Sequence, residues 1–422
     1  MKPLLAALPV TFFFASAAWA DPPDLAAAIR QNDLAVIEAV AGSDGKESAV
    51  AQGALAALRR EDDAALEILA AAAEDDAMAA PLKRAAWSVS AGVYLRQGRF
   101  AEAADAFEAA DAALPEADEE AARSAAQARD FARTAAPAAA MRAHVADTGE
   151  AEITRDLAGL PRATALINGQ PQDAVLDTGA NYSTIMASVA EALGVHLLEG
   201  DISVGASAND SVAGRIGIAS NLVLAGGEMT DVVFIVLPDE ALSFADGAYT
   251  IPAIIGLPVF AALGRVSFEQ QGETEWLRHA ASEEGWTEGS NLVFSGLSPI
   301  ALLKANGSPV RMFIDSGATT SHLTPRAVLD YPALLEGATS DSTRIGGAGG
   351  ERVFEDAAII PRLEIEIAGQ TVTLSDIHVL DDAADGRHGL IGQDILNATT
   401  GYVIDFGARR FELLPPASLP TP

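Results

Sequence analysis

Two acidic residues stand in nearly identical surroundings 138 positions apart in the chain. Residues 174–180 read Ala-Val-Leu-Asp-Thr-Gly-Ala, and residues 312–318 read Met-Phe-Ile-Asp-Ser-Gly-Ala. Each acid, Asp177 or Asp315, follows an apolar run and precedes a hydroxyl residue, a glycine and an alanine. Two acids at the ends of two matching apolar strands predict one site built from a pair of carboxyl groups.

Paired carboxyl groups have a characteristic chemistry. Two carboxylates held a few Å apart repel each other, so the pair tends to share one proton. The ionised member can take a proton from a bound water that attacks a carbonyl, and the protonated member can donate to the developing oxyanion. Which acid carries the proton is a property of the pair. This chemistry requires no metal and no cofactor, and we expect neither.

Other site chemistries lack the residues that they need. Cysteine is absent, the six histidines show no metal-ligand spacing, and no Gly-x-Ser-x-Gly elbow or lysine-containing phosphate loop occurs. The remaining alternative is that the two acids only cap turns at strand ends. The repeated context favours the paired site over that alternative.

The residues around each acid predict the strands that carry it. Residues 163–167 and 173–176 flank an Asn-Gly pair, which is a strong hairpin signal. Each copy then continues with an apolar-apolar-glycine run, a short helical stretch and a closing strand, at 254–256, 257–263 and 264–268 in the first copy and at 390–392, 393–399 and 401–406 in the second. The repeat therefore predicts two homologous lobes of mostly antiparallel sheet.

These motifs resemble the retropepsin-type aspartic proteases. The string Val-Leu-Asp-Thr-Gly-Ala with a later Ile-Ile-Gly, repeated as Phe-Ile-Asp-Ser-Gly-Ala with Leu-Ile-Gly, carries the resemblance, which covers about residues 155–415. The second copy also contains the glycine-rich stretch 345–350, which is similar to the flap tip of the viral enzymes. The resemblance implies a mainly-β, two-lobed acid-protease fold with closed, mostly antiparallel barrel lobes, both within one chain.

The resemblance also implies roles for individual residues. Asp177 and Asp315 correspond to the catalytic dyad. Thr178 and Ser316 correspond to hydroxyls that cross between the lobes and hold the acids coplanar. The glycines expected to permit close approach, or to form the flap, are Gly179, Gly317, Gly346, Gly347, Gly349 and Gly350.

The alanines after the two motifs bear on the working pH. Pepsin-like sites commonly have Ser or Thr at the positions of Ala180 and Ala318, where a hydroxyl bonds a catalytic carboxylate and favours its ionised form. Alanine lacks that hydrogen bond. We therefore expect a dyad that works at mildly acidic pH.

The chain departs from the family pattern at two places. The first copy's counterpart of the flap, residues 204–211, lacks the double-glycine repeat and the tyrosine of pepsin-like flaps. Viral enzymes carry a charged residue after the apolar-apolar-glycine run, whereas residues 257–258 are Leu-Pro and residues 393–394 are Gln-Asp here. We therefore expect only one glycine-rich flap, and the usual contact between the lobes is missing from the sequence.

A third Asp-Thr-Gly occurs at residues 147–149 and provides a comparison. It follows His-Val-Ala and has no long apolar run before it, and Glu150 places charge where the family has a small residue. We interpret it as a linker turn.

The N-terminal part of the chain is predicted to be helical. Residues 24–140 are rich in Ala, Leu, Glu and Arg, which are strong helix formers. Within them, residues 87–115 show the aromatic and small-residue spacing of a tetratricopeptide repeat. We expect a small stack of helical hairpins, either a surface for a protein partner or a packing and spacer domain.

The first 20 residues predict an export signal. A basic start, an apolar run from Leu4 to Phe14 and an Ala-Trp-Ala end are typical of a secretory peptide cleaved after Ala20. A membrane anchor is the weaker alternative, because Pro9 interrupts a run that is short for a span. We expect an exported protein, periplasmic or secreted, with no stable membrane insertion after signal removal.

Composition narrows the class of partner. Half of the residues are apolar, which is enough for several cores, and the formal net charge is -32. Such a surface repels phosphate backbones, so we expect no nucleic acid partner.

Together these features predict a signal peptide at 1–20, a helical TPR-like domain at 21–141 and retropepsin-like lobes at 142–280 and 281–422. The predicted function is an aspartic endopeptidase acting on a peptide or protein substrate. The alternative is a non-catalytic peptide-binding or scaffolding protein that uses the same fold.

Overall fold

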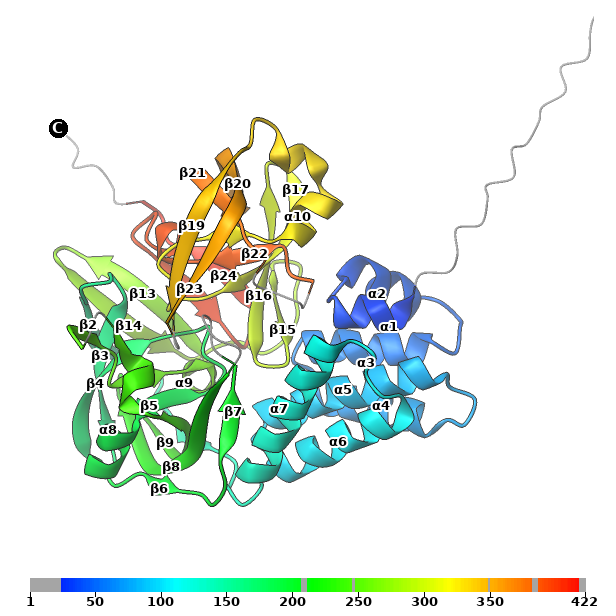
Figure 1. Ribbon diagram of the computed structural model, residues 1–422, viewed down its shortest axis with the longest axis horizontal. Helices are drawn as coiled ribbons and strands as arrows, with labels where there is room; N and C mark the ends of the chain where they lie inside the picture. Colours follow the sequence, from blue (N-terminus) through cyan, green and yellow to red (C-terminus); the bar gives the residue numbers. More distant parts are fainter. Residues whose placement is uncertain (1–23, 206–210, 245–246, 348–349, 382–385, 417–422) are drawn as a thin grey trace, which may run out of the picture.

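A computed structural model describes residues 24–205, 211–244, 247–347, 350–381 and 386–416. The predicted signal peptide and Gly349 lie outside these residues, as do most residues of the first copy's flap counterpart. The described chain begins with a helical region and continues with two β-rich lobes, which lie side by side in Figure 1. No helix in the described ranges is both long and apolar enough to cross a membrane.

The helical region contains seven helices within the described residues. They are α1 (Leu25–Arg30), α2 (Leu34–Ala41), α3 (Ser48–Leu58), α4 (Asp62–Glu74), α5 (Ala80–Arg96), α6 (Phe100–Ala113) and α7 (Glu119–Ala135).

Successive helices from α2 to α7 pack against one another, so the region is a stack of hairpins. The α5–α6 hairpin turns at Gly98, whose φ of 69° favours glycine. The helical region is therefore confirmed, whereas its membership of the tetratricopeptide class stays a prediction.

The first lobe is a closed barrel. Within the described residues its strands follow the order β3-β4-β12-β5-β9-β8, and pairing of β3 with β8 closes the ring. Its strands are β3 (Pro161–Ile167), β4 (Gln170–Leu176), β12 (Ala253–Ile255), β5 (Ser183–Met186), β9 (Gly227–Leu237) and β8 (Val212–Leu224). The β3–β4 hairpin turns at the expected Asn168-Gly169, and both residues have positive φ.

The second lobe repeats this arrangement. Its described strands follow the order β16-β17-β22-β18-β21-β20, and β16 pairs with β20. These are β16 (Ser298–Ala305), β17 (Ser308–Ile314), β22 (Gly389–Ile391), β18 (His322–Leu323), β21 (Gln370–Val379) and β20 (Gly350–Ile367). The two-lobed barrel fold expected from the repeat is therefore present.

A further sheet joins the two lobes. It has the order β24-β23-β13-β14-β2, with β24 (Arg410–Leu413), β23 (Gly401–Asp405), β13 (Arg265–Gln271), β14 (Thr274–Ala280) and β2 (Thr148–Arg155). Strand β13 of the first lobe pairs with β23 of the second, so these are the two predicted closing strands. One apolar cluster extends through both barrels and this sheet, which makes the lobes a single packed unit.

The interpretation of Asp147-Thr148-Gly149 as a linker turn is wrong. Thr148 is the first residue of strand β2, and Gly149 pairs with His279 in the sheet that joins the lobes. A Cβ at Gly149 would lie 1.9 Å from the carbonyl oxygen of Ala225, so close strand packing requires this glycine. The alternation of polar and apolar residues just after Gly149 is the sequence signal for this strand.

Candidate active site

Parallel strand pairing places each acid at the same point of its lobe. Strand β12 runs parallel to β4, and the amide of Asp177 donates to the carbonyl of Ile255 over 3.0 Å. Strand β22 runs parallel to β17, and the amide of Asp315 donates to the carbonyl of Ile391 over 3.0 Å. The repeated apolar-apolar-glycine runs are therefore the strands that fix where each acid emerges.

Two hydroxyls cross between the lobes below the acids. The amide of Thr178 donates to Ser316 Oγ over 2.9 Å, and the amide of Ser316 donates to Thr178 Oγ1 over 3.1 Å. Their hydroxyls donate onward to the carbonyls of Ile314 and Leu176, over 3.2 and 2.8 Å. Both side chains are fully buried, where satisfied hydrogen bonds specify geometry strongly. This reciprocal exchange locks the two acid-bearing loops together.

The glycines of the two motifs leave room for the acids. A Cβ at Gly179 would lie 2.5 Å from Cγ of Asp315, and a Cβ at Gly317 would lie 2.5 Å from Cγ of Asp177. Each glycine therefore faces the carboxyl group of the opposite lobe. The near-equal distances show that the two carboxyls meet across a pseudo-two-fold arrangement.

The two carboxyl groups face each other across the lobe boundary, and both remain partly exposed. Asp177 Oδ1 accepts from the amides of Gly179 and Ala180 over 2.8 and 3.1 Å. Asp315 Oδ1 accepts from the amide of Gly317 over 2.8 Å.

Burial raises the pKa of Asp177, although these amide hydrogen bonds oppose the shift. Burial and then the charge of Asp177 raise the pKa of Asp315 well above its ordinary value. At a pH where a solvated aspartate is ionised, the pair can therefore still hold a proton.

Comparison with known proteins agrees with this geometry. The aspartyl protease family model matches the chain twice, at residues 163–259 and 301–395, and each segment contains one acid. Both lobes are therefore similar to aspartyl protease lobes. This match confirms the resemblance seen in the motifs.

Among solved structures, a retropepsin-like aspartic protease from Rickettsia conorii is 18% identical to this chain, with a TM-score of 0.24. That match covers 34% of this chain and 98% of that one. Comparison with the curated proteins gives no match.

A serine behind each acid supports its protease-like lobe in the same way. Ser183 Oγ accepts from the amide of Gly256 over 3.1 Å, and Ser321 Oγ accepts from the amide of Gly392 over 2.9 Å. These bonds fix the glycines that end β12 and β22. The two serines stand 138 positions apart, which is the offset of the repeat, but the sequence does not show which amides they bind.

Gln393 stands where the viral enzymes carry a charged residue after the apolar-apolar-glycine run, and it makes a contact between the lobes. Gln393 is buried, and its amide donates to the carbonyl of Ser316 over 2.6 Å. Its Oε1 accepts from Arg155 of the first lobe over 2.6 Å, and Arg155 also bonds Asn397 and forms an ion pair with Glu275. This contact leaves no local pattern in the sequence, because Arg155 ends strand β2 and Gln393 belongs to the other lobe.

The expected flap is a long hairpin of the second lobe. Strands β19 (Thr339–Gly347) and β20 pair in antiparallel fashion, with Gly346 opposite Glu351 and Gly347 opposite Gly350. Three of the predicted flap glycines therefore lie where the hairpin turns. Figure 1 shows β19 extending from the second lobe toward the first.

The helical region packs directly behind the first acid-bearing loop. Tyr182, five positions after Asp177, is buried against the helices, and its hydroxyl donates to the carbonyl of Leu95 in α5 over 3.1 Å. Its ring stacks on Phe131 of α7 with centroids 4.6 Å apart, and Phe100 of α6 lies 6.1 Å away. The helices thus contribute to the surroundings of the candidate site.

Proposed function

We propose that this chain is an aspartic endopeptidase that hydrolyses peptide bonds with a water activated by Asp177 and Asp315. The observation that carries the proposal is the reciprocal pair of hydrogen bonds between Thr178 and Ser316, which brings together two acids from different lobes. A pair of acids that only capped turns would not need this cross-lobe arrangement.

In this mechanism the dyad holds one proton and a water lies between the carboxyls. Asp177 Oδ1 accepts from two backbone amides and Asp315 Oδ1 from one, and the single proton belongs to the pair. The ionised carboxylate takes a proton from the water as the water oxygen attacks the peptide carbonyl carbon. The protonated carboxyl donates to the carbonyl oxygen as negative charge develops there.

Collapse of the tetrahedral intermediate then breaks the carbon–nitrogen bond. The leaving amine takes up a proton from the dyad, and the new carboxyl group leaves with the other fragment. As the new carboxyl group forms, a hydroxyl of the intermediate returns a proton to the other acid, so the dyad again holds one proton.

We further propose a mildly acidic working range. Backbone amides donate to Oδ1 of the two acids, and alanines occupy the positions where pepsin-like sites have a hydroxyl. Without that hydroxyl, the raised pKa values keep the one-proton form populated above the strongly acidic range. An exported protein in a mildly acidic compartment fits this range, and the sequence of residues 1–20 supports export.

The decisive screen is digestion of a peptide library by the mature protein from pH 3 to 8. We expect cleavage with a maximum at mildly acidic pH, inhibited by pepstatin-like compounds. Asp177→Asn and Asp315→Asn variants serve as matched controls. Peptide capture without cleavage at any pH would contradict the proposal and favour a binding protein.

A further inference from the structure

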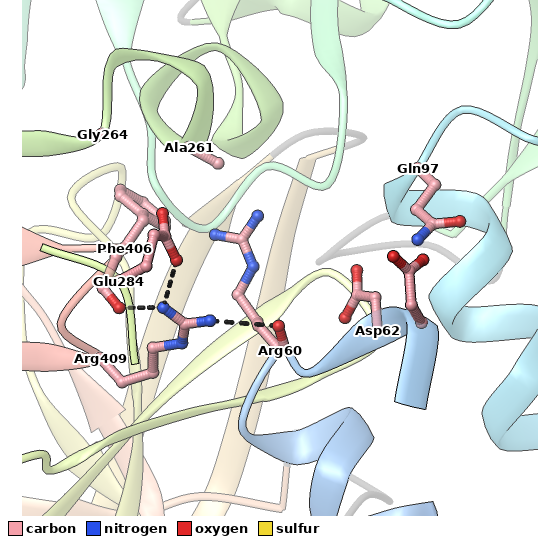
Figure 2. Close-up of a pocket in the computed structure, with 10 residues that line it drawn as sticks. Arg60, Asp62, Gln97, Ala261, Gly264, Glu284, Phe406 and Arg409 are labelled. Carbon is pink, nitrogen blue, oxygen red and sulfur yellow. Dashed lines mark hydrogen bonds and ion pairs between the residues drawn. The ribbon is translucent and has the colours of Figure 1, made fainter. Parts of the chain in front are cut away.

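A pocket of about 280 Å³ lies at the junction between the helical region and both lobes. It is lined by the α3–α4 turn, by α9 (Leu257–Leu263) and by the segments around Glu284 and Phe406 (Figure 2). Its lining includes neither acid of the candidate dyad. The volume is just below the usual range of about 300–1,000 Å³ for small-molecule sites, so only a small ligand group would fit.

Arg60 supplies the functional group of this pocket. Its guanidinium has no hydrogen bond or ion pair among the described residues, and Figure 2 shows it between Glu284 and Asp62. The guanidinium carbon lies 5.1 and 5.8 Å from the ring centroids of Phe294 and Phe406, both buried. Five N–H donors on a fixed plane are thus held in place and available.

The neighbouring charges are already engaged with one another. Arg96 bonds Asp62, with its shortest contact at 2.5 Å, and also bonds the carbonyl of Ala57. Arg409 pairs with Glu284 over 2.7 Å and donates to the carbonyl of Arg60 over 3.1 Å.

Arg96 is thus paired with Asp62, and Arg409 is paired with Glu284. Within the described part of the chain, the positive charge of Arg60 is left without a paired carboxylate. Asp63 also lines the pocket, but it is exposed at its rim. Burial, together with the charge of Arg96, lowers the pKa of Arg60 to about 10, which agrees with a cation short of partners.

We propose that this pocket binds a carboxylate group, with Arg60 as its anchor. A planar guanidinium matches a carboxylate in a two-point hydrogen bond, and the single surplus charge suits a monoanion. Asp62 and Glu284 would repel a doubly charged ligand. The carboxylate can come from a small free acid or from the C-terminus of a peptide chain.

Isothermal titration of the mature chain with three probes tests this site and separates the two sources. The probes are acetate, N-acetylalanine as a mimic of a chain terminus, and the uncharged N-acetylalaninamide. We expect saturable binding of the carboxylates and none of the amide. Tighter binding of N-acetylalanine than of acetate would identify a chain terminus, and equal binding would identify a free acid.

Variants make the assignment specific. Arg60→Gln should weaken carboxylate binding at least about tenfold, and Arg60→Lys should weaken it less, because a charge remains without the two-point fork. Arg123→Gln, an exposed arginine of α7 outside the pocket lining, is the matched control and should bind as wild type does. Equal melting temperatures in chloride alone would show that the variants are folded.

Absence of saturable carboxylate binding, or binding that folded Arg60→Gln retains in full, would overturn the proposal. Neither result depends on peptidase activity, so the outcome is independent of the proposed function.

Discussion

At the level of single residues, the candidate dyad depends on Gly317. A Cβ at this position would lie 2.5 Å from Cγ of Asp177, so Gly317→Ala must displace that carboxyl. We expect kcat/KM to fall by about 100-fold or more, because a shift of about 1 Å is enough for such a loss. Steady-state kinetics on a cleaved peptide measures this.

Gly45→Ala is the control for that variant. Its added Cβ would meet its nearest atom, Ser43 Oγ, at an ordinary 3.6 Å. Equal activity of Gly317→Ala and Gly45→Ala would show that the glycine is not required.

Ala180 should set the pH range of the site. Ala180→Ser places a hydroxyl where it can donate to a carboxylate oxygen of Asp177, which favours the ionised form and lowers the apparent pKa of the dyad. We expect the pH profile of kcat/KM to move toward lower pH. An unchanged profile, or a shift toward higher pH, would refute this role of the alanine.

The ionised carboxylate of Asp315 should destabilise the folded chain at neutral pH. Its pKa in the folded chain is raised above the ordinary value of 3.8, mainly by burial, so the folded state binds more protons than the unfolded state between these two values. Stability from this group is therefore lost as pH rises through that window. Asp315→Asn removes the penalty.

We expect the Asp315→Asn variant to melt at a higher temperature than wild type at neutral pH. The difference should vanish below about pH 4, where the ordinary carboxyl is also protonated. Thermal unfolding across this range is the measurement, and a variant that melts lower at neutral pH would count against a raised pKa.

The sequence identified the acids, their hydroxyls and their glycines because these residues repeat at one fixed offset. Tyr182 and Gln393 could not be found in this way. Tyr182 contacts helices far away in the chain, and Gln393 depends on Arg155, which lies 238 positions before it. Contacts of this kind arise from tertiary packing and leave no local pattern.

Among the secondary-structure elements, α5, α6 and α7 should influence the site through Tyr182. Phe131→Ala removes the ring that stacks on Tyr182 and should cost about 3–5 kcal/mol of stability. We expect kcat to fall more than KM changes, because the loop that carries Asp177 loses its support. Kinetics below the melting transition measures this effect.

Leu69→Ala provides a matched control in the same helical region. Leu69 is fully buried in α4, within a cluster that does not include Tyr182. It should lose stability in the same way but keep kcat. An equal loss of kcat in both variants would point to general destabilisation instead of positioning.

The strands were predictable where a hairpin turn or a repeated run marked them. The ends of β3, β4 and α9 agree with the sequence analysis to within a few residues, because Asn-Gly, glycine and proline mark them. Strand β2 was not predicted, because it is half exposed and rich in polar residues. Its partner strand β14 lies more than 100 positions away in the chain.

At the scale of the whole molecule, both halves of the site belong to one polypeptide. The single apolar cluster through both lobes and the sheet of β13 and β23 hold the halves together without a second chain. We therefore expect specific activity to stay constant on dilution of the protein. A loss of specific activity on dilution would show that the site needs a second copy.

The central claim is that Asp177 and Asp315 act as one catalytic unit. Its most direct test is kcat/KM of Asp177→Asn, Asp315→Asn and the double variant on one cleaved peptide. Each single variant should lose at least about 100-fold, and the double variant should lose little more, because residues that act together are not additive. Near wild-type activity in either single variant, or losses that multiply in the double variant, would contradict the claim.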